Sequence, residues 1–183
     1  MYVINTSARS DPASSKRSEV PLLPPSWAAL SLTEVANLAP VQLLNWRVAA
    51  ERGLQLAIRR EDLLHPSLGG NKFYKLAGHL DAFQKSGAHR LLSFGGAFSN
   101  HLYALAAAGH ELNIPTVGIV RGEKPERLSP TLEDAARMGM ELVFVSRAEY
   151  RRKTDPDWLA ELGLRFTDAY VIPEGGGDVL GSA

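Results

Sequence analysis

The stretch "RLLSFGGAFSNHLYALAAAGHELNIPTVGIVRG", residues 90–122, contains a complete strand–helix–strand pattern. It begins with the apolar run "RLLSFGG", which is typical of a buried strand that ends at a glycine pair. The run "TVGIVRG" is a second segment of this kind, and the residues between the two are apolar almost all round, as in a buried helix. Two buried strands joined by a helix usually form a parallel pair with a right-handed crossover. The stretch therefore predicts an α/β fold.

The same alternation continues on both sides of this stretch. Apolar side chains at spacings of three and four predict a helix from Phe73 to Phe83 that ends at Gly87. The segment "SPTLEDAARMG" predicts a helix with Ser129 as its N-cap and Pro130 in its first turn. Further strands are predicted for "LQLAIRR", "ELVFVS" and "AYVIP", and helical segments for residues 30–38 and 148–162, the latter with a break at Asp155–Pro156.

Strands that recur about every 25 residues with helices between them predict a mostly parallel sheet. The sheet is expected within residues 74–171, and the side chains expected on its buried strands are Leu92, Val117, Ile119, Val143 and Val145.

Composition excludes several classes of protein. The chain has 183 residues, 45% of them hydrophobic, with 20 basic and 20 acidic side chains and therefore no net charge. Such a chain has no general electrostatic attraction for nucleic acid or anionic membranes. It has no cysteine, which excludes disulfides, thiolate nucleophiles and cysteine-bound metal. No apolar run is long enough to span a membrane, and residues 1–20 do not read as a secretory signal. We expect a cytoplasmic protein.

Three glycine-bearing turns, "LGGNK", "FGGAFSNH" and "EGGG", lie where a parallel sheet binds ligands, near the carboxyl ends of strands. The first leads into Lys72, at the start of the predicted helix. Lys72 is a solvated charge, a phosphate contact or a nucleophile whose pKa is lowered by the helix dipole and by burial. The phosphate-loop spelling requires serine or threonine after the lysine, and Phe73 stands there instead.

Ser99 also has two interpretations. It stands where the helix of residues 100–113 begins, so it is either the N-cap or a hydroxyl that points into a cleft. The G-x-S-x-G elbow of a serine hydrolase is absent. His101 lies two positions further along the helix and faces a different direction, so the two are not a nucleophile–base pair. The five histidines show no metal-ligand spacing. His79, His89 and His110 are expected to be solvated or packed.

Four segments in order resemble one family: "REDLLHPSLGGNKFYKL" (60–76), "LLSFGGAFSNHLYALAAAGHELNIPTVGIVRGE" (91–123), "SPTLEDAARMGMELVFVSRAEYR" (129–151) and "YVIPEGG" (170–176). The chain resembles the 1-aminocyclopropane-1-carboxylate deaminase / D-cysteine desulfhydrase family of pyridoxal-phosphate enzymes. The resemblance implies the three-layer tryptophan-synthase-β fold type. It also implies that Lys72 binds the cofactor covalently and that Ser99 assists at the substrate. Asn100 would contact the cofactor's phenolic oxygen, and Lys75 would lie near its phosphate.

The resemblance further implies a domain organisation. Residues 1–20 are expected to be a disordered lead-in and 21–73 the N-terminal part of a large domain. Residues 74–172 would form the small α/β domain and 173–183 a truncated return to the large domain. Family members continue into a C-terminal half that carries the phosphate-binding glycines, so the chain reads as an N-terminal portion. The isolated 183-residue chain is expected to bind the cofactor poorly and to be inactive.

The function implied is that of a deaminase or lyase that acts on a small amino acid, of the D-cysteine or 1-aminocyclopropane-1-carboxylate type. The class terms lyase and hydrolase both follow from the family, and full-length relatives are expected to be homo-oligomers. The turn "AFSNH" differs from the "IQSNQ" of strict ring-opening enzymes, which favours a desulfhydrase-like enzyme or an amino-acid lyase of unassigned substrate. Two alternatives stay open: an inactive fragment, and a non-enzymatic α/β module that binds a phosphorylated ligand.

Overall fold

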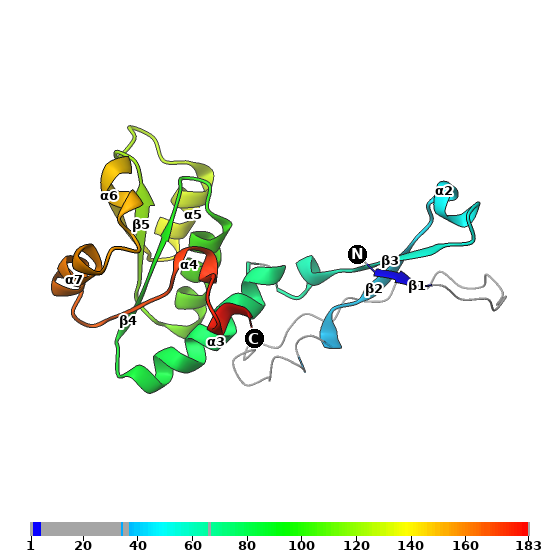
Figure 1. The fold of residues 1–183 in the computed structure, drawn as a ribbon, viewed down its shortest axis with the longest axis horizontal. Helices are drawn as coiled ribbons and strands as arrows, with labels where there is room; N and C mark the ends of the chain where they lie inside the picture. Colours follow the sequence, from blue (N-terminus) through cyan, green and yellow to red (C-terminus); the bar gives the residue numbers. More distant parts are fainter. Residues whose placement is uncertain (1, 5–33, 35–36, 66, 183) are drawn as a thin grey trace. The chain divides into compact units, whose positions relative to one another are not determined.

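The computed structural model describes residues 2–4, 34, 37–65 and 67–182 (Figure 1). It divides into two compact units, Met1–Gly70 and Asn71–Ala183, and each is described by itself. The domain boundaries expected from the sequence stay a prediction. Among the described residues, no helix is long and apolar enough to cross a membrane.

The first unit contains a small antiparallel sheet. Its strands are β1 (Tyr2–Ile4), β2 (Val41–Leu44) and β3 (Gln55–Arg59), in the order β1-β3-β2. The helix α2 (Arg47–Ala50) connects β2 to β3, and the 3₁₀ helix η2 (Glu61–Leu63) follows β3.

One expectation is tested in this unit. The strand predicted from "LQLAIRR" is present as β3, and its partners are antiparallel. Tyr2–Ile4 pair with β3, and the lead-in expected over residues 1–20 stays a prediction. Pairing between positions more than 50 residues apart has no local sequence signal. The other residues of the lead-in lie outside the described part of the chain, as does most of the helical segment predicted for 30–38.

The second unit contains a four-stranded parallel sheet. Its strands are β4 (Arg90–Gly95), β5 (Thr116–Arg121), β6 (Glu141–Val145) and β7 (Ala169–Val171), in the order β6-β5-β4-β7. All three strand pairings are parallel. The predicted α/β fold with a mostly parallel sheet is confirmed. Leu92, Val117, Ile119 and Val143 are buried as expected, whereas Val145 at the end of β6 is only partly buried.

Helices cover both faces of this sheet and give three layers (Figure 1). One face packs against α3 (Asn71–Ser86), α4 (Asn100–Leu112) and α5 (Pro130–Arg137). The other face packs against α6 (Arg147–Arg151) and α7 (Pro156–Arg165). On this second face, the sheet residues Leu92, Phe94, Val117, Ile119 and Val143 form one cluster with the helical residues Tyr150, Trp158 and Leu162 and with Phe166. The face with α3 and α4 holds the small or polar residues Ser93, Gly95 and Gly118.

The helix starts follow from local sequence. Ser99, Ser129, Ser146 and Asp155 are the N-caps of α4, α5, α6 and α7, and each side chain accepts a hydrogen bond from a backbone N–H of the first turn. Pro130 lies in the first turn of α5, as predicted. The predicted break at Asp155–Pro156 separates α6 from α7.

The strand order reverses once, next to β4. From β4 the chain passes to β5 and β6 on one side, and then it crosses the sheet to place β7 on the other side of β4. The carboxyl edge between two strands whose connections leave in opposite directions is where open α/β sheets bind ligands. In this unit that edge lies between β4 and β7.

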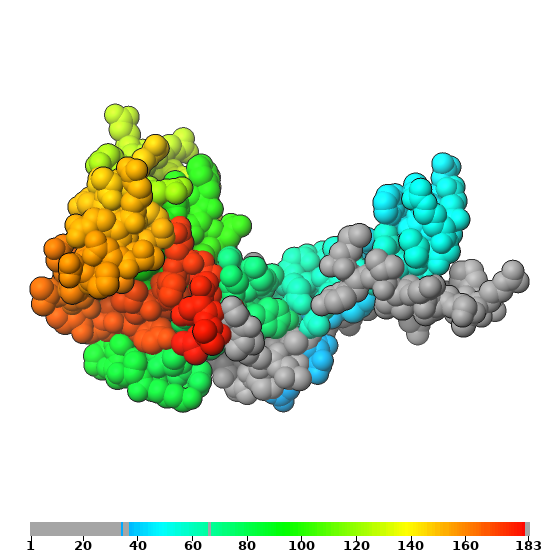
Figure 2. Space-filling view, in the orientation of Figure 1, coloured from blue at the N-terminus to red at the C-terminus, as the bar shows by residue number. Residues whose placement is uncertain are grey.

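The chain continues from β7 into two short 3₁₀ helices, η3 (Glu174–Gly176) and η4 (Leu180–Ser182). Both contact α3, and η3 also contacts α4. Their residues form part of the surface of the second unit, where they are red in Figure 2. The glycine-rich turn "EGGG" is thus held against the starts of two helices.

Candidate functional site

Three segments meet at the carboxyl edge of β4 and β7. These are the first turns of α3, the start of α4 and the turn η3. A Cβ atom added to Gly176 would lie 3.2 Å from Cβ of Lys75 on α3 and 3.7 Å from Cε1 of His101 on α4. One point of η3 therefore touches residues of both helices. We refer to this convergence, with Lys72, Lys75, His101 and Gly176, as the switch-point site.

Lys72 lies in the first turn of α3 and is half-buried. Burial lowers the pKa of its amine, and the nearby charge of Lys75 lowers it further. Both effects increase the fraction of neutral, nucleophilic amine. Lys75 is one turn further along α3 and is also half-buried. The pKa of the Lys72 amine is therefore lower than that of an exposed lysine.

Ser99 and Asn100 stand at the start of α4. The Ser99 hydroxyl accepts a hydrogen bond of 3.2 Å from the Leu102 N–H, which is the N-cap role. A Cβ atom at Gly95 would lie 2.6 Å from Ser99 Cβ, so the glycine turn is required for packing. Asn100 is exposed. Within the described residues, no hydrogen bond or ion pair joins Lys72 to Ser99 or Asn100, so their convergence on one cleft stays a prediction.

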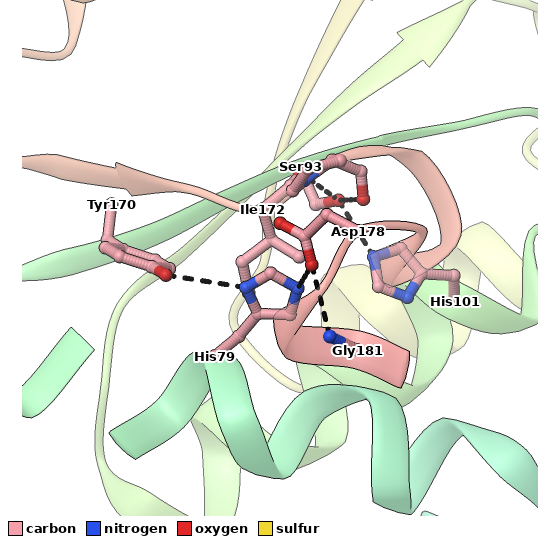
Figure 3. A network of polar contacts seen from close by, with 8 residues as sticks. His79, Ser93, His101, Tyr170, Ile172, Asp178 and Gly181 are labelled. Carbon is pink, nitrogen blue, oxygen red and sulfur yellow. Dashed lines mark hydrogen bonds and ion pairs between the residues drawn. The ribbon is translucent and has the colours of Figure 1, made fainter. Parts of the chain in front are cut away.

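His101 is buried and makes one polar contact with the sheet. Its Nε2 lies 2.9 Å from the hydroxyl of Ser93 on β4, and that hydroxyl donates a hydrogen bond of 2.8 Å to the carbonyl of Ile172 (Figure 3). Burial lowers the pKa of His101 to about 4, and the charges of Lys72, His79 and Lys75 add to this shift. The imidazole is therefore neutral near pH 7. Its Nδ1 is buried and has no hydrogen-bond partner among the described residues.

His79 on α3 is completely buried and contacts two groups from the end of the chain. Its Nδ1 lies 3.4 Å from the Tyr170 hydroxyl, and its Nε2 lies 3.1 Å from a carboxylate oxygen of Asp178. In Figure 3, Tyr170 and Asp178 approach the ring on opposite sides. The approach of Nε2 to Asp178 has an ion-pair distance but makes no hydrogen bond among the described residues. Asp178 accepts from the Gly181 N–H at 3.1 Å.

Glycines allow the end of the chain to lie directly on α3. A Cβ at Gly78 would overlap the carbonyl oxygen of Leu180, and one at Gly181 would overlap the carbonyl oxygen of Gly176. These backbone contacts leave no room for a side chain at either position. Together with the His79–Asp178 contact, these glycines fix η3 and η4 beside Lys75.

Glu174 of η3 is held from the opposite side of the sheet. The hydroxyl of Tyr150 donates a hydrogen bond of 2.7 Å to Glu174, and Lys153 forms an ion pair of 3.3 Å with the same carboxylate. Burial raises the pKa of the Tyr150 hydroxyl, and the hydrogen bond to Glu174 raises it further, so the hydroxyl stays protonated. The carboxylate of Glu174 also acts on His101 by raising its pKa.

A separate cleft of about 580 Å³ opens at the carboxyl ends of β5 and β6. It is lined by Ala97, Val120, Arg121, Gly122, Glu123, Pro125, Phe144 and Arg147. Arg121 lies over the ring of Tyr150, 5.7 Å from its centre. None of the four site residues predicted from the sequence lines this cleft. In the described residues there is also no cluster of side chains that could hold a metal ion.

Lys72 and Lys75 both lie on α3, which converges with α4 and η3, and their role at a cofactor stays a prediction. The sequence did not indicate the contacts of the histidines. His79 is packed, which was one of its two expected states, but its pairing with Asp178 was not foreseen. His101 was treated only as a neighbour of Ser99. Its contact with Ser93 joins positions eight residues apart across a turn. The one available signal was a polar Ser93 within the otherwise apolar run of β4.

No protein-family model matches this chain. A protein of Thermotoga maritima, provisionally named 1-aminocyclopropane-1-carboxylate deaminase, is 33% identical over 149 residues, which are 78% of this chain and 46% of that protein. A D-cysteine desulfhydrase of Yersinia pestis is 29% identical over 153 residues, which are 81% of this chain and 46% of the relative. The chain spans about half the length of the curated relatives it matches.

Comparison with solved structures finds relatives of the same kind as comparison of sequences. The structure of a homologue of 1-aminocyclopropane-1-carboxylate (ACC) deaminase matches with a TM-score of 0.64 and 28% identity, over 79% of this chain and 44% of that one. A hydrogen sulfide-producing enzyme from Fusobacterium nucleatum matches with a TM-score of 0.54 and 14% identity, which supports the fold alone. In sequence and in fold, the chain is therefore a relative of the 1-aminocyclopropane-1-carboxylate deaminases and D-cysteine desulfhydrases, over about half of their length.

Proposed function

We propose that this chain contributes the lysine-bearing half of the active site of a pyridoxal-phosphate-dependent deaminase or lyase that acts on a small amino acid. The substrate is of the D-cysteine or 1-aminocyclopropane-1-carboxylate type, because proteins with these names are the relatives found. Because the chain spans about half the length of these relatives, turnover is proposed for the whole protein. The binding groups below are proposed for this chain.

The observation that carries the proposal is the position and state of Lys72. It begins a helix at the edge where the strand order reverses, and burial together with Lys75 lowers the pKa of its amine. A lysine forms a covalent bond to an aldehyde through its neutral amine, and burial and the charge of Lys75 both lower the pKa of Lys72 in that direction while its side chain stays partly exposed. A lysine that served only for solubility would not need to be partly buried beside a second lysine.

The surrounding residues fit an anionic, aldehyde-bearing cofactor. Lys75 supplies a second positive charge, which favours the phosphate dianion. Gly176 brings the backbone of η3 close to Lys75 and His101, because a Cβ there would lie only 3.2 Å from Cβ of Lys75. His101 offers a buried, unpartnered Nδ1 in the same place. Pyridoxal phosphate, when bound, supplies the electron sink for proton removal and elimination.

The residues of this chain would bind the cofactor and orient the substrate. Lys72 would hold the cofactor and move a proton at its Nζ. Asn100, in the first turn of α4, would donate to the cofactor's phenolic oxygen. Ser99 would act at the substrate, with its hydroxyl fixed by the Leu102 N–H. Lys75 would contact the phosphate group.

A serine-hydrolase function for Ser99 has no support. His101 directs its Nε2 to Ser93 and not to Ser99, so no base activates the Ser99 hydroxyl. The relatives are named deaminases and desulfhydrases, and the class term hydrolase has no support in these names.

The test is product release by the whole protein for which turnover is proposed, and not by the isolated 183-residue chain, with pyridoxal phosphate supplied. We expect pyruvate from D-cysteine or 2-oxobutyrate from 1-aminocyclopropane-1-carboxylate, and loss of either product in Lys72→Ala and in Ser99→Ala. Lys85→Ala is the matched control, because Lys85 lies on the same helix with an exposed side chain that pairs with Asp81. The proposal is wrong if Lys72→Ala retains native turnover.

A further inference from the structure

The hydrogen-bond network around Ser93 fixes the tautomer of His101. A serine hydroxyl has one hydrogen, and the carbonyl of Ile172, 2.8 Å away, can only accept it. The contact of 2.9 Å between Ser93 Oγ and His101 Nε2 therefore requires that Nε2 donates. The hydrogen of the neutral imidazole is on Nε2, and Nδ1 is a bare acceptor.

That acceptor has no donor in the described part of the chain. His101 is 3% exposed, so water does not replace the missing partner at the surface. A buried polar atom without a partner is rare in native proteins and needs a physical reason. One such reason is a donor that arrives only in one state of the protein.

The charged groups that face His101 come from two elements. α3 contributes Lys72, His79 and Lys75, and η3 contributes Glu174. α3 contacts α4, and Lys75, one turn beyond Lys72, approaches the same point of η3 as the His101 ring, so Lys72 lies one helical turn from that point. Lys72 itself makes no ion pair or hydrogen bond with a described residue, although its amine is partly buried. A buried acceptor without a donor and a half-buried donor without an acceptor thus lie in the same site.

We propose that Nδ1 of His101 receives the amine of Lys72 whenever that amine is not covalently engaged, so that His101 is a positioning residue for the lysine. The lysine side chain is flexible and carries three donors, so it can move between this acceptor and a bound ligand. Burial keeps His101 neutral near pH 7, so it accepts a hydrogen bond without removing the lysine's proton. The catalytic meaning of this contact rests on the proposed function, but the contact itself does not.

The first experiment measures the imidazole directly. Long-range ¹H–¹⁵N spectra of the 183-residue chain labelled with ¹⁵N-histidine should show a protonated Nε2 and a bare Nδ1 for His101 at pH 7. In Lys72→Met, the Nδ1 resonance should move towards that of an acceptor without a hydrogen bond, and in Lys75→Met it should stay in place. The proposal is overturned by an Nδ1–H tautomer, or by an Nδ1 resonance that does not respond to Lys72→Met.

The second experiment uses two substitutions that separate the two ring nitrogens. His101→Gln keeps a donor for Ser93 and removes the acceptor at the Nδ1 position, whereas His101→Asn keeps an acceptor there and removes the contact with Ser93. An acceptor stabilises the ammonium form, so its loss should speed acylation of Lys72 relative to Lys85 by about threefold or more in His101→Gln. The ratio of the Lys72 acylation rate to the Lys85 acylation rate should stay close to native in His101→Asn. An equal change in both variants contradicts the proposal.

Neither experiment includes the cofactor. If Lys72 fails to bind pyridoxal phosphate but these results hold, the proposed function fails and the Lys72–His101 contact stands. If the cofactor binds at Lys72 but the Nδ1 resonance of His101 does not change in Lys72→Met, the Lys72–His101 contact is wrong and the proposed function stands.

Discussion

Gly109 and Gly163 both lie in helices but have different surroundings, so replacing each by alanine should change the free energy of unfolding in opposite directions. Gly109 in α4 lies against the connection to β5, and a Cβ there would lie 2.6 Å from the carbonyl oxygen of Ile114 and would also overlap Thr116. Gly109→Ala should lower the free energy of unfolding by about 1–3 kcal/mol, because backbone must move to accommodate the methyl group. Urea unfolding of the chain measures this.

Gly163 in α7 is the matched control. A Cβ at this position has nothing within 4 Å. Gly163→Ala should raise the free energy of unfolding by up to about 1 kcal/mol, because alanine loses less conformational entropy in a helix. If the two substitutions have the same sign, the close approach of α4 to β5 is not as described.

His101 predicts a pH dependence of stability. Its pKa is about 4 in the folded chain against 6.5 in an unfolded one. The unfolded state therefore binds the extra proton between these values, and stability falls as the pH is lowered from about 6.5 to about 4. The loss from this group is about 3 kcal/mol, for a shift from 6.5 to about 4.

The measurement is the free energy of unfolding at several pH values, for the native chain and His101→Gln. The native curve should be steeper between pH 4 and 6.5. His79, whose pKa burial also lowers, adds a slope of the same sign to both curves, so the difference isolates His101. Parallel curves would contradict the buried, neutral state of His101.

At the scale of single elements, α7 depends on its N-cap, Asp155. Asp155 accepts hydrogen bonds from the backbone N–H groups of Asp157 and Trp158. Trp158 is buried in the cluster on that face of the sheet. Asp155→Ala should lower the free energy of unfolding by about 1 kcal/mol, since two N–H groups lose their acceptor.

Asp155→Asn keeps an acceptor at the cap and should cost only a few tenths of a kcal/mol. Thermal unfolding followed by circular dichroism distinguishes the two. Equal destabilisation by both substitutions would mean that the ion pair with Arg152, and not the cap, stabilises this helix start.

The sequence predicts well those elements whose limits are set by neighbouring residues in the chain. The start of α5 follows from Ser129 and Pro130, and the break before α7 follows from Asp155–Pro156, because capping and proline geometry act within one turn. The antiparallel pairing of Tyr2–Ile4 with β3 has no local cause, and the sequence did not indicate it. The tautomer of His101 depends on the carbonyl of Ile172, which is about 70 residues away. Such a contact is visible only after the sheet has formed.

At the scale of the whole molecule, the second unit has its own sheet, helices on both faces and a buried cluster. We expect residues 71–183, expressed alone, to unfold in one cooperative transition, because a unit with its own core can fold independently. Circular dichroism and urea unfolding of this fragment test the expectation. A fragment with no cooperative transition would mean that residues 1–70 are needed to complete its core.

The reversal of strand order beside β4 was not specified by the sequence pattern. Alternating strands and helices predict a parallel sheet but not which strand lies next to which, because every right-handed crossover has the same local signal. The family resemblance supplied Lys72 as the cofactor lysine. The structure adds that α3, α4 and η3 converge where β7 returns to β4.

The central claim, that Lys72 is the cofactor lysine, is tested most directly by trapping with borohydride. The chain is incubated with pyridoxal phosphate, reduced and digested, and the modified peptide is identified by mass spectrometry. The account predicts that Lys72 is labelled in preference to the other five of the six lysines, and that Lys72→Ala does not redirect the label to Lys75. Selectivity among lysines tests the site even if affinity is low. Equal labelling of all exposed lysines, or preferential labelling of any lysine other than Lys72, would contradict the account.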